Sequence, residues 1–201
     1  LAVIEFILAR SGLKVFNAER NSINGGSLRC YATHDVNFAF RNDQFSQNLY
    51  RLHQEEFDLE LDTNKPYLHF QDRINVHREE LLLLIKQLRN DGKRIHIYGA
   101  STKGNVILQW CGIDHHFIDF AAERNPEKFG ATTLGTGIPI ISEIESRAKN
   151  PDFYLVLPWH FREEIVKRER EILRKGTGLI FPLPAIEIIS ASAGRRRRLT
   201  E

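Results

Sequence analysis

The sequence predicts an α/β fold in which a doubly wound parallel sheet follows a helical segment and a β-hairpin. Short apolar runs alternate with helical patterns from residue 93 to residue 190. Such alternation is typical of parallel strands joined by right-handed crossovers. Before that region, a helix pattern leads into two strand-like runs that enclose a Gly-Gly pair. This second observation indicates an antiparallel hairpin.

The first segment, residues 1–40, is expected to be a helix followed by the hairpin. Apolar residues recur at helical spacing over residues 3–8. Residues 14–19 and 28–33 form the two strand-like runs, and Asn24-Gly25-Gly26 between them can adopt the positive φ angles of a tight reversal. A helix and one hairpin are too small to bury a core of their own, so this segment is expected to complete a larger sheet.

The second segment, residues 41–92, is expected to consist of connecting helices. Its second half carries an apolar stripe with charged residues on the other faces. The stripe consists of Ile74, Leu81, Ile85 and Leu88. Pro66 separates this helix from the preceding one, because proline suits the first position of a helix.

The third segment, residues 93–190, is expected to form the parallel sheet. Strands are expected at residues 94–98, 117–122, 138–141, 153–157 and 179–181. Helices are expected at residues 103–111, 143–148 and 162–174. The order strand, helix, strand therefore repeats along the whole segment, which favours the doubly wound class.

Length and composition are those of an ordinary globular protein. The chain has 201 residues, of which 42% are hydrophobic and 27% charged, so a packed core can form. The longest apolar run, Leu81–Ile85, is too short to cross a bilayer, and no secretory leader opens the chain. Cys30 and Cys111 lack metal-like spacing and are expected to be reduced. These features predict a cytoplasmic protein with no membrane partner.

Positive charge is concentrated at the C-terminus. The formal net charge is +2, and Arg195–Arg198 alone contributes four positive groups, so the rest of the chain is slightly acidic. We therefore expect no nucleic-acid partner. Residues 191–201 are expected to form a disordered basic tail, with a phosphate-binding arm as the alternative. Because the chain has no Met and opens inside a helix pattern at Leu1, we expect it to be the C-terminal portion of a longer protein.

The turn after the first strand of the third segment has the composition of a phosphate-binding loop. It contains Gly99, Ser101, Thr102, Lys103, Gly104 and Asn105. Where a strand leads into a helix, backbone N–H groups and the helix dipole attract anions. The hydroxyl groups and Lys103 add donors and a positive charge, and the small residues let a phosphate approach the backbone.

Two known phosphate-loop patterns almost match this turn. Gly99 and Gly104 have the spacing of a Walker A loop, but Asn105 stands where lysine is required, which argues against an ATPase. The dinucleotide pattern G-x-G-x-x-G lacks its middle glycine, because Ser101 occupies that position. Its acidic partner is present, since Glu123 ends the next strand and can bind ribose hydroxyls. The sequence thus predicts a Rossmann-like nucleotide site, with a purely structural turn as the alternative.

A second cluster follows the strand expected at residues 153–157. Trp159 could stack on a base or sugar and His160 could donate a hydrogen bond, because ligands of open α/β sheets bind outside the carboxyl ends of the strands. Packing at the sheet edge and capping of the next helix are the alternative roles. His115 and His116 lie in a loop where metal binding would need further ligands, and none is visible nearby in the sequence.

Four strings in one order carry a family resemblance. They are Tyr98-Gly-Ala-Ser-Thr-Lys-Gly-Asn105, Glu123-Arg-Asn-Pro-Glu-Lys128, Leu157-Pro-Trp-His-Phe-Arg162 and Leu179-Ile-Phe-Pro-Leu-Pro184. Together they resemble the C-terminal domain of sugar-nucleotide C-methyltransferases, which are class I enzymes that depend on S-adenosylmethionine. The resemblance covers nearly the whole chain. It implies that residues 1–40 are the end of a methyltransferase domain, because that fold ends in a helix and a reversed hairpin.

The resemblance implies a division of labour in the full-length enzyme. A zinc-bearing N-terminal domain and an S-adenosylmethionine domain would precede this chain, so no catalytic residue and no metal ligand is expected here. The chain would bind the nucleotide-sugar substrate. Ligands expected for its diphosphate are Ser101, Thr102, Lys103 and Asn105. Glu123 would bind the ribose, while Trp159 and His160 would contact the nucleoside or sugar.

Two other functions remain as alternatives. An NAD(P)-dependent oxidoreductase domain is supported by the spacing of Gly99, Gly104 and Glu123 and opposed by Ser101. A non-enzymatic interaction module would use the helices of residues 41–92 to bind a protein partner. The sequence leaves open the acceptor, the methylated carbon and the oligomeric state.

Overall fold

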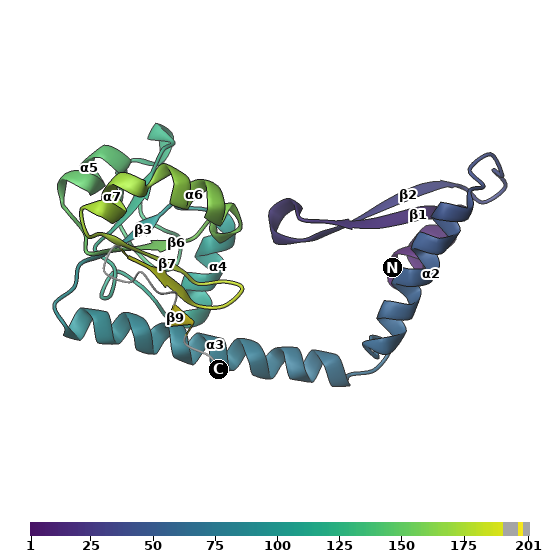
Figure 1. Cartoon of the computed structure of the whole chain (residues 1–201), viewed down its shortest axis with the longest axis horizontal. Coiled ribbons are helices and arrows are strands. Elements are labelled where there is room, and N and C mark those ends of the chain that lie inside the picture. Colours follow the sequence, from purple (N-terminus) through teal and green to yellow (C-terminus); the bar gives the residue numbers. More distant parts are fainter. Residues whose placement is uncertain (191–196, 199–201) are drawn as a thin grey trace. The chain divides into compact units, whose positions relative to one another are not determined.

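The computed structural model describes residues 1–190 and 197–198, and it divides into two compact units, Leu1–Arg73 and Ile74–Glu201 (Figure 1). The boundary falls inside helix α3 (Lys65–Asn90), whereas the sequence placed its boundaries near residues 40 and 92. The reason is that the first half of the expected connecting segment packs in the core of the first unit and the second half packs in the core of the second unit. Each unit has a buried core of its own.

The first unit contains a helix, a hairpin and a second helix. Its elements are α1 (Ala2–Ala9), β1 (Leu13–Asn21), β2 (Ser27–His34) and α2 (Asp43–Asp58). The hairpin is antiparallel, and Asn24 (φ 56°) and Gly26 (φ 128°) provide the positive φ angles expected at its reversal. Helix α2 contributes Leu52 to a small core with Leu1, Val15 and Ala18, so it belongs to this unit.

The second unit is a sheet covered by helices on both faces. Its strands are β3 (Ile95–Tyr98), β4 (Phe120–Glu123), β5 (Ile140–Ser142), β6 (Phe153–Val156), β7 (Gly178–Phe181), β8 (Glu187–Ile189) and β9 (Arg197–Arg198). Its helices, besides the second half of α3, are α4 (Thr102–Cys111), α5 (Glu143–Ala148), α6 (Arg162–Arg168) and α7 (Arg170–Arg174). The single helix expected at residues 162–174 is divided at Glu169, whose backbone departs from helical geometry (ψ 18°).

The strands lie in the order β5-β4-β3-β6-β7-β8-β9. The chain adds β4 and β5 on one side of β3 and then returns to place β6 on the other side. All neighbouring pairs from β5 to β7 are parallel, while β8 and β9 are antiparallel. The predicted doubly wound α/β fold is confirmed, with an antiparallel edge that the sequence analysis did not foresee. The reversal between β3 and β6 is the place where such folds bind ligands.

One face of the sheet packs against α3 and α4, and the other against α5, α6 and α7; Figure 1 shows α3 and α5–α7 on opposite sides. The first face buries Ile95 and Ile97 of β3 against Leu81, Ile85 and Leu108. The alternate residues of the same strand, His96 and Tyr98, point to the other face. Both faces are therefore buried, as the nearly continuous apolar strands require.

The C-terminal residues are described in part. Residues 191–196 and 199–201, which the sequence analysis assigned to a disordered tail, lie outside the described residues. Between them, Arg197–Arg198 pairs with β8 as the short strand β9. Among the described helices, none combines the length and the apolar character needed to cross a bilayer.

Candidate functional site

A pocket of about 490 Å³ opens at the carboxyl ends of β3, β4 and β6. This volume lies within the range typical of small-molecule sites. The polar and charged side chains in its lining are Tyr98, Ser101, Glu123, Arg124, Lys128, Glu143, Glu164 and Arg168. The pocket therefore occupies the point where the strand order reverses, the expected ligand position in an open α/β sheet.

The turn after β3 approaches the loop after β6 very closely. Gly99 has a φ of 81°, and a Cβ atom placed on it would lie 3.1 Å from the ring of Pro158. A Cβ atom on Gly104 would lie only 2.3 Å from the Cβ atom of Leu157. These two glycines thus serve close packing between α4 and β6, a role that the dinucleotide fold also gives to a glycine.

Ser101 begins helix α4. Its hydroxyl oxygen accepts a hydrogen bond from the backbone N–H of Gly104 at 3.1 Å, which satisfies one of the unpaired donors of the first turn. The positive end of the helix dipole lies at this first turn, beside the pocket that Ser101 lines. Thr102 and Lys103 occupy the first turn and are exposed.

Asn105 lies one position further and serves a neighbouring loop. Its amide nitrogen donates to the carbonyl oxygen of Leu134 at 2.9 Å. Its amide oxygen is buried without a hydrogen-bond partner among the residues that the structure describes. This arrangement ties α4 to the loop around Leu134.

Glu123 ends β4 and is engaged by its own loop. One carboxylate oxygen accepts the backbone N–H groups of Arg124 (2.7 Å) and Asn125 (3.2 Å), and the other lies 3.1 Å from Nζ of Lys128. Partial burial raises the pKa of Glu123, but these hydrogen bonds and the Lys128 charge outweigh it and hold the pKa below its ordinary value. The ammonium group of Lys128 also donates to the carbonyl oxygen of Ala100 at 3.0 Å. Lys128 therefore links the ends of β3 and β4.

A charged network lies beside the pocket on the α5–α7 side. The Glu169 carboxylate is fully buried, and one of its oxygens accepts the hydroxyl of Tyr98 at 2.9 Å. The same oxygen pairs with Arg147 at 2.8 Å and with Nε of Arg168 at 3.2 Å. Arg168 also pairs with Glu143. The network fixes Arg168 and Tyr98 in the pocket wall.

Trp159 and His160 form a short 3-10 helix after β6. Trp159 packs against the core between the sheet and α6, as the structural alternative expected. Burial of the His160 imidazole and the neighbouring Lys103 charge lower its pKa, so the ring is neutral near pH 7. Its Nδ1 atom is buried and lacks a hydrogen-bond partner within the described part of the chain.

The structure brings the two predicted clusters together, but only part of the predicted set lines the pocket. Of the nine residues named from the sequence, those in the lining are Gly99, Ser101 and Glu123. Those outside it are Thr102, Lys103, Gly104, Asn105, Trp159 and His160. Sequence reasoning missed Arg124 and Lys128, although both lie in the Glu123–Lys128 string that carries part of the family resemblance. It also missed Arg168, which reaches the pocket from a helix 45 residues beyond β4 and left no local signal.

Comparison with known proteins agrees with this fold. The model of the C-methyltransferase C-terminal domain family matches residues 22–184. The C-methyltransferase NovU of Streptomyces niveus is 31% identical over 182 residues, which are 90% of this chain and 42% of that protein. The chain thus spans about two fifths of the length of this curated relative. The matched region includes the hairpin reversal, α3 and the whole pocket, and the chain belongs to the C-methyltransferase C-terminal domain family.

Proposed function

We propose that this chain is the substrate-binding part of an S-adenosylmethionine-dependent C-methyltransferase and that its pocket holds the nucleotide diphosphate of a keto-sugar or related acceptor. The observation that carries the proposal is the pocket at the strand-order reversal, next to the first turn of α4. Membership of this family supports a methyltransferase as the full-length enzyme.

Electrostatics support a phosphate near the first turn of α4. The lining contains three basic side chains, Arg124, Lys128 and Arg168, and the three acidic ones Glu123, Glu143 and Glu164. Side-chain charge alone therefore gives an anion no net attraction. The backbone N–H groups and dipole of α4, which carry a fixed positive field, decide where a phosphate lies.

Arg124 is the basic group best suited to reach a ligand. Its side chain is exposed, and no ion pair involves it among residues 1–190 and 197–198. By contrast, Lys128 is held by Glu123 and Ala100, and Arg168 by the buried network. Arg124 can thus turn toward a diphosphate at little cost, because a guanidinium group binds phosphate through two parallel hydrogen bonds.

His160 supports a role for the loop after β6. The imidazole of His160, next to Lys103, has a buried nitrogen for which the described residues provide no hydrogen-bond partner, so a ligand can satisfy it. Lys103 on the first turn of α4 places its charge beside the same loop. We therefore keep Lys103 and His160 as ligand contacts, together with Ser101 and Glu123.

Methyl transfer itself would need groups that this chain does not supply in the proposal. Preceding parts of the enzyme would bind S-adenosylmethionine and zinc and would contain the catalytic acid–base residues. S-adenosylmethionine would supply the methyl group for a carbon next to the carbonyl group of the acceptor. The role of this chain would be to fix the nucleotide end of the acceptor so that its sugar faces that reaction.

Dinucleotide binding as in an oxidoreductase has weaker support. The Glu123 carboxylate, which would bind the ribose of NAD, is already occupied by Lys128 and two backbone N–H groups. Ser101 caps α4 where that fold needs a glycine for the pyrophosphate. The contacts of Glu123 constrain the ribose of any nucleotide equally, so it is the serine in place of the middle glycine that disfavours NAD relative to a mononucleotide.

Calorimetric titration of the chain with dTDP, UDP, NAD and S-adenosylmethionine tests the proposal. We expect saturable binding of a nucleoside diphosphate and none of S-adenosylmethionine. Arg124→Ala and Lys103→Ala should each weaken that binding by roughly tenfold, the effect of losing one charged hydrogen bond. Lys167→Ala is the matched control, because Lys167 is an exposed residue of α6 that does not line the pocket.

The outcomes separate the alternatives. Binding of NAD alone would point to the oxidoreductase. Nucleotide binding that persists unchanged in both variants would place the ligand outside this pocket. The absence of any binding would contradict a substrate-binding role for the chain by itself.

A further inference from the structure

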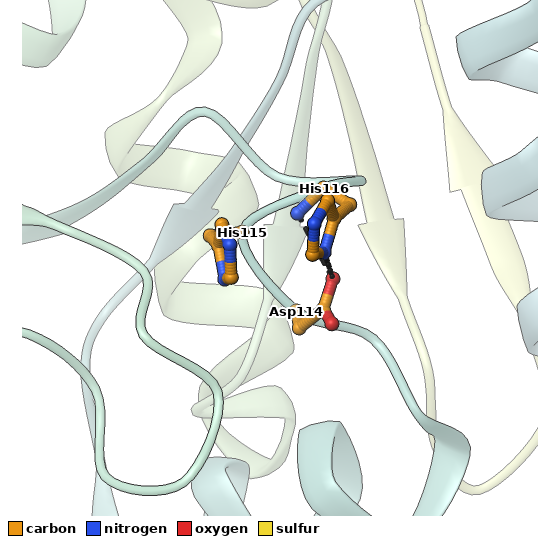
Figure 2. A group of neighbouring side chains, drawn as sticks. All are labelled: Asp114, His115 and His116. Atoms are coloured by element: carbon orange, nitrogen blue, oxygen red, sulfur yellow. Dashed lines mark hydrogen bonds and ion pairs between the residues drawn. The ribbon is translucent and has the colours of Figure 1, made fainter.

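Three consecutive side chains in the connection between α4 and β4 form a compact donor group. Asp114, His115 and His116 each offer one metal-ligand atom, and these atoms lie within 4.8 Å of one another (Figure 2). The connection precedes β4, so it lies at the opposite end of the parallel strands from the pocket. Asp114 is the further ligand that two adjacent histidines need.

Asp114 and His116 are already spaced as neighbouring ligands. The Oδ1 atom of Asp114 accepts hydrogen bonds from the backbone N–H of His116 at 2.9 Å and from its ring Nδ1 at 3.1 Å, as Figure 2 shows for the ring. Two adjacent ligands bound at about 2.1 Å to one cation lie roughly 3 Å apart. A cation can therefore replace the shared ring proton with little movement. That proton can move to Nε2, because the His116 side chain is 72% exposed to water.

His115 is oriented from the opposite side. Its Nδ1 atom lies 3.3 Å from the carbonyl oxygen of Thr136. A carbonyl only accepts, so the proton stays on Nδ1 and the lone pair of Nε2 is left available. Histidines that bind metals commonly use their second nitrogen in this way, which fixes the tautomer and the ring direction.

The Thr136 carbonyl is itself held firmly. It also accepts the backbone N–H of His115 at 3.1 Å. The buried hydroxyl groups of Thr133 and Thr136 are 2.6 Å apart, and Thr133 also accepts the backbone N–H of Ile138 at 2.9 Å. The two imidazole rings lie side by side with their centroids 4.1 Å apart. The donor group is thus built on anchored backbone.

We propose that Asp114, His115 and His116 bind one divalent transition-metal ion, with Zn²⁺ as the best match. Two imidazoles and one carboxylate suit Zn²⁺ and its neighbours, whereas Mg²⁺ and Ca²⁺ prefer oxygen ligands throughout. Exposure of the site leaves the remaining positions to water. The Nδ1 contact of His115 with Thr136 joins this site to the neighbouring loop. This site is separate from the zinc that the family resemblance places upstream of the chain.

Titration of the tag-free chain with ZnCl₂ in a calorimeter tests the site. One ion per chain is expected, and His115→Ala, His116→Ala and Asp114→Asn should each weaken binding at least tenfold. Two matched controls should keep the parent affinity: His69→Ala, which removes an exposed histidine from α3, and Cys30→Ser, which removes a partly exposed thiol.

Two further measurements guard against misfolding and adventitious binding. Each variant's circular dichroism without metal should match the parent. The melting temperature of the parent should rise with ZnCl₂ concentration and that of the three site variants should not, because an ion that binds only the folded state stabilises it. No binding below about 1 mM Zn²⁺, which corresponds to roughly −4 kcal/mol, would overturn the proposal. So would binding that all three site variants retain, since the ion would then be held elsewhere.

Discussion

Replacing Gly104 by alanine probes the contact that fixes helix α4 at the pocket. The added Cβ atom would lie 2.3 Å from Cβ and 2.6 Å from Cδ1 of Leu157, which is almost fully buried at the end of β6. Carbon atoms in good contact are about 3.5–4.0 Å apart. The helix must therefore move by more than 1 Å or the strand end must yield, because the nearest atom is attached directly to the backbone and cannot rotate away.

The size of the effect follows from two opposing contributions. Alanine stabilises a helix relative to glycine by up to about 1 kcal/mol. Overpacking of a well-packed core costs typically 1–3 kcal/mol and sometimes more, and this contact is far shorter than a usual one. We expect Gly104→Ala to lower the free energy of unfolding by about 2 kcal/mol. Leu157→Ala should not restore it, because the Cβ atom at 2.3 Å remains.

Urea unfolding followed by tryptophan fluorescence measures the stability of the second compact unit, which contains Gly104. The chain has two tryptophans, Trp110 and Trp159, and both lie in the second unit. Gly92→Ala is the matched control, since Gly92 has a φ of 72° and open space around its Cβ position. That control should cost only about 1 kcal/mol, the strain of a left-handed residue. If Gly104→Ala were as stable as the parent chain, the close packing of α4 on β6 would be wrong.

Three further predictions concern buried polar groups and the pocket. Burial lowers the pKa of His96 to about 4 from 6.5, so the unfolded chain takes up the His96 proton before the folded chain does as the pH falls. The contribution of His96 to the free energy of unfolding should be complete above pH 6.5 and should decrease by about 3 kcal/mol toward pH 4. His96→Gln should flatten this pH dependence, which urea unfolding at several pH values would measure. Glu169→Gln should lower the free energy of unfolding by about 1–3 kcal/mol in the same assay, because it removes the charge that pairs with Arg147 and Arg168. An unchanged urea midpoint would contradict the buried network. Lys128→Ala should loosen the turn after β3, which native-state hydrogen exchange at residues 99–101 would reveal, and protection equal to that of the parent would refute the link.

The sequence predicted most of the fold because strand and helix patterns alternate so regularly after residue 93. It missed the antiparallel strand β8, whose three residues carry too little pattern to separate from a loop. It also assigned α2 to a connector, because helical periodicity alone does not reveal which core the apolar side of a helix packs against. Leu52 packs against Leu1, Val15 and Ala18, and such a contact between distant residues cannot be seen from local periodicity.

The position of the candidate pocket was easier to predict than the residues that line it. The glycine turn and the end of β4 were correctly placed at one edge, because parallel strands bring their carboxyl ends together. The partners of each side chain were not predictable. Ser101 and Asn105 carry donors suited to a phosphate, yet the hydroxyl of one caps α4 and the amide of the other binds the Leu134 carbonyl. Sequence composition shows which groups are available, while tertiary contacts decide which of them are already used.

Ion pairs among the lining side chains limit the kinds of ligand that the pocket can bind. Glu123 holds Lys128, and Glu143 and Glu169 hold Arg168, so the charges that line the pocket are largely neutralised before any ligand enters. A ligand that depended on breaking these pairs would leave the largely buried carboxylate of Glu123 or Glu143 without this cationic partner, which is costly. A diphosphate bound at the first turn of α4 would avoid that cost, because backbone N–H groups would receive it and the exposed Arg124 would complete the contact. On the proposed function, the paired charges therefore act as fixed walls that shape the pocket, and the backbone of α4 supplies the attraction.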